Sequence, residues 1–227
     1  MRFSRFIGGS LAALAIGVCP LRAGELALKV GQKAPPEEIS QEVAKALGKR
    51  CIQLLDRDQP VFEFWFRAPV PLKKKPATAG KGLEAVAMAT LIGVVRIHKL
   101  LTDYRDDELY EGVFTMRYGS IPSDGDHLDA SEYPYFAVLI PAKKDRTLAG
   151  IKTYKAMTKA SLKETDSEHP MILSLRPVRK PAVKIPAFLV PAPNHKSVLL
   201  KTTGQVAGTK QTTDILLQVV YEGEGEF

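Results

Sequence analysis

The chain has 227 residues, a formal net charge of +7 and 45% hydrophobic residues. This length fits one domain with a core large enough to fold without disulfides or a structural metal. The charge is only mildly positive, which argues against a nucleic-acid-binding protein with a dense basic face.

Residues 1–23 have the three-part layout of a secretory signal peptide. Arg2 and Arg5 supply the positive start, an uncharged apolar stretch covers residues 6–19, and Ala23 supplies a small residue before cleavage. The apolar stretch is shorter than the roughly 20 residues that a membrane span requires. We therefore expect cleavage near Ala23 and a bacterial protein that is secreted or periplasmic, with no membrane span in the mature chain.

The mature chain retains a single cysteine, Cys51. Cys19 falls within the leader, where Val18 rather than a small residue precedes it, so we do not expect a lipid anchor. A single thiol cannot form an internal disulfide. Because Cys51 lies in an apolar run, we interpret it as a buried small hydrophobic residue rather than a nucleophile or an intermolecular thiol.

Residues 24–50 are predicted to form an N-terminal extension with a short helix. Residues 24–36 have the character of an extended lead-in. Apolar side chains then share one helical face between Glu37 and Leu47, and Gly48 follows as a helix end.

The main domain is predicted to span residues 51–221, followed by a flexible tail over 222–227. A second helix is predicted over 147–163 and a loop over 68–89. Apolar side chains that recur between polar turns predict strands at 51–55, 60–67, 90–100, 112–118, 135–140, 171–175, 197–201 and 215–221. This pattern predicts a mainly β fold, an antiparallel β-sandwich with one or two peripheral helices.

Motifs for common enzyme chemistry are absent from the sequence. It contains no G-x-S-x-G, H-E-x-x-H or C-x-x-C pattern. Residues 204–210 resemble a phosphate-binding loop only superficially, because the glycine spacing is wrong, and we interpret them as a turn. Three adjacent lysines, Lys73–Lys75, are interpreted as solvated surface rather than an anion-binding patch.

The densest polar chemistry lies in the predicted loop over 119–134. Asp124 and Asp126 flank a glycine, so both carboxylates can face one point, and His127 follows directly. Carboxylate oxygens suit calcium, and a histidine would suit zinc, copper or iron. His169 could join such a site only through folding. The competing interpretation is an Asp-Gly turn that binds its own backbone, and we expect no cofactor beyond this possible divalent metal.

One stretch carries a resemblance to known sequences. Residues 112–119 read G-V-F-T-M-R-Y-G, and Pro122 and the run D-G-D-H at 124–127 follow. This pattern resembles a family of uncharacterised exported bacterial proteins with the motif G-[FY]-T-x-R-Y-G…P-x-D-G-x-H, a domain of unknown function. The resemblance covers residues 60–177. It implies an exported sandwich domain and supplies no catalytic residues.

These observations favour a non-enzymatic binding domain of the cell envelope or exterior. No catalytic signature is assembled, and a rigid β scaffold with polar loops is typical of binding proteins. Its partner would be an envelope polymer or protein. The alternative is a metal-binding protein or metal-dependent enzyme that uses the Asp124-Asp126-His127 loop.

Overall fold

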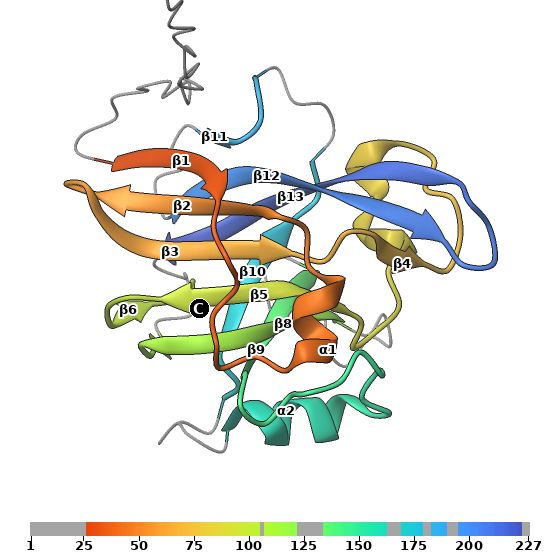
Figure 1. The fold of residues 1–227 in the computed structure, drawn as a ribbon, viewed down its shortest axis with the longest axis horizontal. Helices are drawn as coiled ribbons and strands as arrows, with labels where there is room; N and C mark the ends of the chain where they lie inside the picture. The colour runs from red at the N-terminus through yellow and green to blue at the C-terminus, as the bar shows by residue number, and fades with distance from the viewer. Residues whose placement is uncertain are drawn as a thin grey trace, which may run out of the picture.

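The computed structural model describes residues 26–104, 107–121, 134–162, 169–178, 183–189 and 195–223. Within these residues the fold is mainly β, as predicted, with two α-helices at the periphery (Figure 1). The strands are β1 (Leu26–Gln32), β2 (Arg50–Asp56), β3 (Gln59–Phe66), β4 (Val70–Leu72), β5 (Leu91–Ile97), β6 (Leu101–Thr102), β7 (Glu108–Leu109), β8 (Gly112–Ser120), β9 (Tyr135–Pro141), β10 (Ile172–Arg176), β11 (Ala187–Phe188), β12 (His195–Val206) and β13 (Thr212–Gly223). The helices are α1 (Gln41–Ala46) and α2 (Tyr154–Leu162), with short 3-10 turns η1 (Ala79–Lys81) and η2 (Leu83–Ala85).

All described strands except β6 and β7 belong to one sheet. Its order is β1-β2-β3-β5-β8-β9-β10-β13-β12-β11, and each neighbouring pair in this order is antiparallel. Among neighbouring strands of the sheet, β2–β3 and β12–β13 are joined by short turns, whereas longer segments join β1 to β2, β8 to β9 and β9 to β10. In the turn between β2 and β3, Arg57 and Asp58 have φ of 49° and 62°, the left-handed pair that closes a two-residue hairpin.

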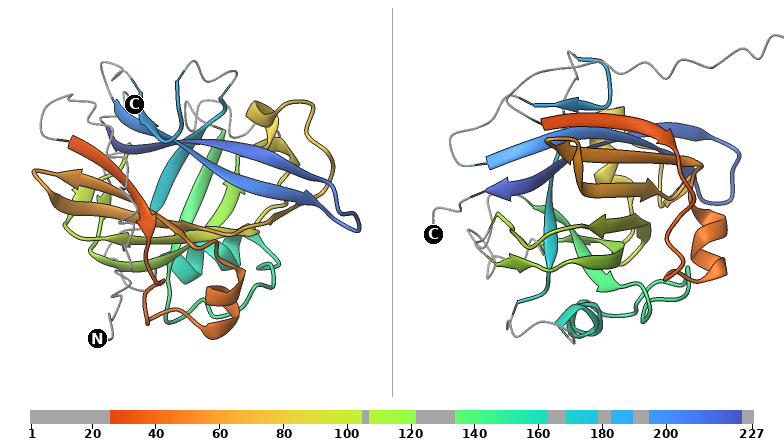
Figure 2. Two further views of the ribbon diagram at one scale, coloured as in Figure 1. Left: turned by 45° about the horizontal axis from the view of Figure 1, so that its top comes forward. Right: turned by 60° about the vertical axis from the view of Figure 1, so that its left-hand side comes forward.

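The sheet curls until its two ends approach each other. β4 follows β3 after a short bend and pairs in parallel with β12, with Val70 opposite Gly204. Beside this pairing the Thr202 hydroxyl donates a hydrogen bond of 2.8 Å to the Arg67 carbonyl. Figure 2 shows β1, β2, β12 and β13 on one side and β5, β8 and β9 on the other, with β10 between them. The two layers are therefore parts of one hydrogen-bonded sheet.

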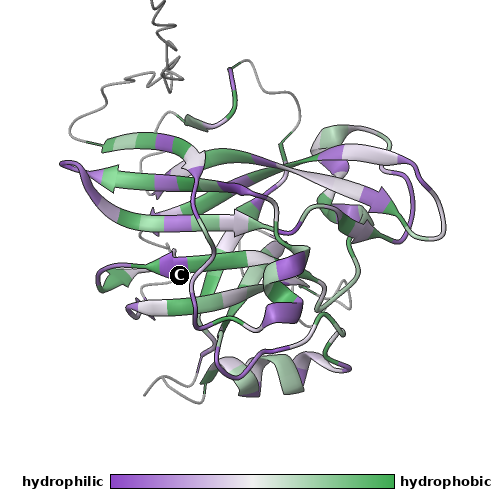
Figure 3. Ribbon diagram, viewed as in Figure 1, coloured by the Kyte–Doolittle hydropathy of each residue, from purple (hydrophilic) through white to green (hydrophobic). Residues whose placement is uncertain are grey.

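The core lies inside this curl. Phe62, Phe64 and Phe66 alternate along β3 and stack with ring-centroid spacings of 5.6 and 6.0 Å. They belong to one large buried cluster to which β2, β3, β5, β8, β9, β10, β12 and β13 all contribute. Each fully buried side chain of this kind contributes about 1.5–3 kcal/mol relative to an exposed one. Figure 3 shows the resulting alternation of hydrophobic and hydrophilic residues along the strands.

The two α-helices cover parts of the outer face of the sheet, and both are shorter than predicted. α1 begins after Ser40, whose hydroxyl accepts a hydrogen bond from the Val43 amide, a standard N-cap. α2 begins at Tyr154, where the Thr153 hydroxyl accepts a hydrogen bond from the Ala156 amide; before it, the carbonyls of Thr147 and Ala149 accept hydrogen bonds from a buried arginine.

Three other segments differ from the sequence-based expectation. Residues 26–32, expected as a lead-in, pair along their full length with β2, so the N-terminal extension is part of the sheet. The expected loop over 68–89 contains β4 and both 3-10 turns. β12 and β13 extend as a long hairpin, and β13 reaches Gly223, inside the expected tail. None of the helices in these described ranges has the length and apolar character needed to cross a bilayer.

Candidate functional site

Of the four residues predicted to bind a metal, the structure describes only His169. Asp124, Asp126 and His127 lie outside the described residues. His169 is described and exposed, just before β10. Among the described residues, no three His, Cys, Asp or Glu side chains come close enough to hold a metal ion.

Cys51 has the environment of a packing residue. It is 1% exposed and packs with Trp65 and Val94 beneath α1. Burial, reinforced by the negative charge of Glu63, raises the pKa of the Cys51 thiol to about 12. A thiol with such a pKa carries almost no thiolate at neutral pH, which argues against a nucleophilic role.

The T-x-R part of the family-like motif forms a buried ion pair. Thr115 and Arg117 lie on the same face of β8, and both reach Asp145 in the turn after β9. The guanidinium donates two 2.7 Å hydrogen bonds to the Asp145 carboxylate and three more to the carbonyls of Ala89, Thr147 and Ala149. Arg117 is fully buried and all its donors are occupied, so this network fixes loops and is not free to bind a ligand.

The glycines at either end of the motif also have structural roles. Gly112 has a φ of +147°, a conformation that side-chain-bearing residues rarely adopt. A Cβ on Gly119 would lie 2.2 Å from the Phe136 ring. The residues 112–119 that carry the resemblance therefore specify the fold of β8 and its surroundings.

A second charged cluster pins the segment before α1 to the sheet. Lys33 and Gln53 both donate hydrogen bonds to Oε1 of Glu63, which is completely buried. Oε2 lies 3.2 Å from Nε2 of His98. Burial by itself raises the pKa of Glu63, but these hydrogen bonds outweigh it and hold the pKa below the ordinary glutamate value. The carboxylate thus favours its ionised form and is paired with Lys33, as expected for a structural clamp.

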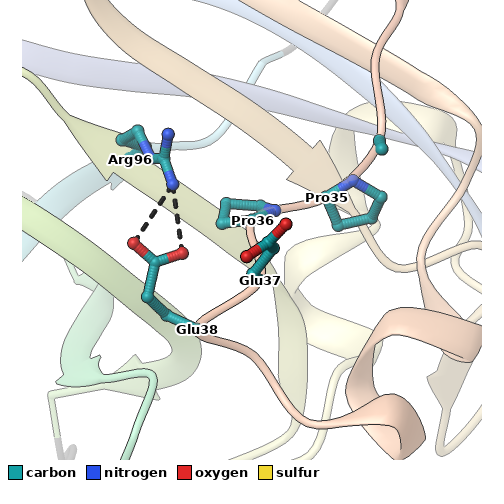
Figure 4. Close-up of a pocket in the computed structure, with 6 residues that line it drawn as sticks. Pro35, Pro36, Glu37, Glu38 and Arg96 are labelled. Atoms are coloured by element: carbon teal, nitrogen blue, oxygen red, sulfur yellow. Dashed lines mark hydrogen bonds and ion pairs between the residues drawn. The ribbon is translucent and has the colours of Figure 1, made fainter.

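Beside this clamp lies an open hollow around Pro35 and Pro36 (Figure 4). Arg96 and Glu38 face each other across it, and the guanidinium donates hydrogen bonds of 3.2 and 3.1 Å to the two carboxylate oxygens. Arg96 is the cation of the described lining and is paired with Glu38, so among these lining residues Glu37 carries the remaining charge. The described lining of the hollow includes no buried apolar wall, so we expect it to bind a small molecule only weakly.

The other cavity lies where the two ends of the curled sheet meet, and we call it the seam pocket. Its volume is about 390 Å³, within the range of small-molecule sites. One side comes from β1, β2 with the two residues before it, and the end of β3 with Ala68; the other comes from β12 and the two residues before β11. Its apolar lining consists of Val30, Ile52, Phe66, Ala68, Ile185 and Pro186, and its remaining lining of Gly48, Lys49, Arg50, Lys201, Thr202 and Thr203.

The floor of the seam pocket belongs to the main core. Ile52 and Phe66 are both members of the large buried cluster and are each 7% exposed. The curled sheet does not seal over them, because between its pairings with β11 and β4 the outer edge of β12 faces the pocket. A ligand that entered here would contact the apolar interior directly.

The rim of the seam pocket carries positive charge. Lys49 and Arg50 are exposed, and within the described residues their side chains form no hydrogen bond or ion pair. Lys201 stands on the opposite side, 3.1 Å from Asp214, and both side chains are about half exposed. The described lining contains no acidic residue. The combination of an apolar floor with Lys49 and Arg50, which have no partner among the described residues, distinguishes this pocket from the hollow at the prolines.

Sequence reasoning did not identify the seam pocket, since its lining comes from five separate chain segments. The one available signal was the pair Lys49-Arg50 directly before an apolar strand. By contrast, Lys73–Lys75, which were interpreted as solvated surface, are exposed in the structure and form no ion pair with another described residue.

No family model matches the chain, and the comparisons with curated proteins and with solved structures found no similar protein. The resemblance to the family of exported proteins therefore stays a prediction.

Proposed function

We propose that this protein is an exported, non-enzymatic binding domain that holds a small, largely apolar molecule in the seam pocket. The observation that carries this proposal is that Ile52 and Phe66, members of the main core, line a cavity of about 390 Å³. Apolar pockets with a few polar groups at their edge are the usual form of small-molecule sites.

The other polar clusters support a binding role over an enzymatic one. Glu63 and Arg117 are both buried and ion-paired with other side chains, and both hold loops in place. Neither Glu63 nor Arg117 lines the seam pocket, and the described lining contains no carboxylate or histidine.

The test uses the neutral fluorophore N-phenyl-1-naphthylamine, whose emission rises in an apolar site. We expect saturable binding of one equivalent by the mature domain. Thr203→Phe, which puts a ring into the pocket from an exposed strand position, should weaken binding at least tenfold.

Thr212→Phe is the matched control, because Thr212 is an exposed strand residue in the same hairpin but does not line the pocket. It should bind the fluorophore like the unmodified protein. If the unmodified domain does not bind the fluorophore, or if Thr203→Phe binds it equally well, the proposal is wrong.

A further inference from the structure

The charged residues around the seam pocket indicate the chemistry of the polar end of its ligand. Lys49 and Arg50 approach it from the start of β2, and Lys201 approaches it from β12. The lining thus has three cations, two hydroxyl groups at Thr202 and Thr203, and no carboxylate within the described residues. A ligand that fills the cavity must place its polar end among these cations.

The cations are available to a ligand. Lys49 and Arg50 have no partner in the described part of the chain, so they lose no ion pair when an anion arrives. The Lys201–Asp214 pair is half exposed, and such pairs contribute little, so Lys201 can be shared with a ligand. An arginine offers a planar fork that matches a carboxylate or phosphate, and the lysines add point charges around it.

We infer that the ligand of the seam pocket is an amphipathic anion, an apolar chain that carries one carboxylate or phosphate group. The chain lies on Ile52 and Phe66, and the anionic group lies between Lys49 and Arg50 on one side and Lys201 on the other. This inference rests on the proposed function, because it needs the seam pocket to hold a ligand, and it adds the chemical class of that ligand.

The experiment compares decanoate with decan-1-ol, which have the same chain length and differ in charge, as competitors of N-phenyl-1-naphthylamine. We expect decanoate to bind about tenfold more tightly at low ionic strength, since each partly exposed charge pair contributes only a few-fold. The preference should shrink in high salt, which screens exposed charges.

A double variant, Lys49→Gln with Arg50→Gln, should remove this preference and leave the affinity for decan-1-ol unchanged. The matched control is Lys81→Gln with Lys210→Gln, which removes the same charge from exposed lysines outside the pocket and should keep the preference. Equal affinity for the two competitors, with fluorophore binding intact, would overturn the inference and leave the proposed function standing.

A final experiment distinguishes binding of a free ligand from binding to a lipid surface. Vesicles of phosphatidylglycerol present the same anionic chemistry on a membrane. Binding of free decanoate that is lost in Thr203→Phe supports the pocket, whereas Lys49- and Arg50-dependent binding to vesicles without binding of decanoate would refute it.

Discussion

The buried ion pair between Arg117 and Asp145 should be essential for stability, and Asp145→Asn tests this. The substitution keeps the shape of the side chain but leaves a fully buried guanidinium without its counter-charge. Removal of one partner of a buried pair costs about 3–5 kcal/mol. A domain has only about 5–15 kcal/mol of unfolding free energy, so the loss is a large share of the total.

Urea denaturation of the mature domain measures the effect. With a slope of about 1–3 kcal/mol per molar urea, the unfolding midpoint should fall by at least about 1 M. Asp214→Asn is the control, since it breaks the half-exposed pair with Lys201 and should cost less than about 1 kcal/mol. Adding Arg117→Met to Asp145→Asn should recover part of the loss, because no charge then stays buried. If Asp145→Asn unfolds within about 1 kcal/mol of the unmodified domain, the pair does not have the role assigned to it.

Three further predictions concern other groups. Because the pKa of Glu63 lies below the ordinary value of about 4.3, its ionised form stabilises the fold fully above that value, and this contribution is lost as the pH falls through the folded pKa. Glu63→Gln should therefore lower the melting temperature at pH 7 and lose less stability on acidification than the unmodified domain; parallel melting curves from pH 7 to pH 2 would contradict this. Cys51 should resist Ellman's reagent in the native domain and react within seconds after unfolding, because its thiol is buried and its pKa is raised to about 12, so rapid native labelling would show that the site is open. Under the proposed function, tagless protein should contain no stoichiometric metal and should melt at the same temperature with and without chelator; a bound metal that is lost in Asp126→Ala would instead support the metal-binding alternative.

Sequence patterns predicted most of the strands that border the core, but they missed β1 and the short, buried β4. Phe62, Phe64 and Phe66 alternate so strongly that β3 was predictable from its own residues. The outer part of the β12–β13 hairpin is polar and leaves the core, so no hydrophobic period marked its length. β1 was missed as a sheet member although Leu26, Leu28 and Val30 alternate and pack against the core; most of its residues are only half buried.

The candidate site was harder to predict because it depends on which strands meet. Arg117 and its partner Asp145 are 28 residues apart, and nothing local links them. The seam pocket brings Arg50 and Lys201 together because the sheet closes on itself. The order of residues along the chain does not show which strands meet in this closure. The sequence indicated which residues are apolar or charged, whereas the curl of the sheet decides which of them share a cavity.

The closure of the sheet between β4 and β12 also bears on how the chain reaches its folded state. Its contacts join distant segments, since the hydrogen bond between Thr202 and Arg67 spans 135 residues. Such contacts are expected late in folding, because a long loop must be ordered before they form. Synthesis runs from the N-terminus, so the early strands emerge well before their closing hairpin exists. If the chain is exported as proposed, this delay keeps the polypeptide open during translocation, and the fold is completed only after its last strands have crossed.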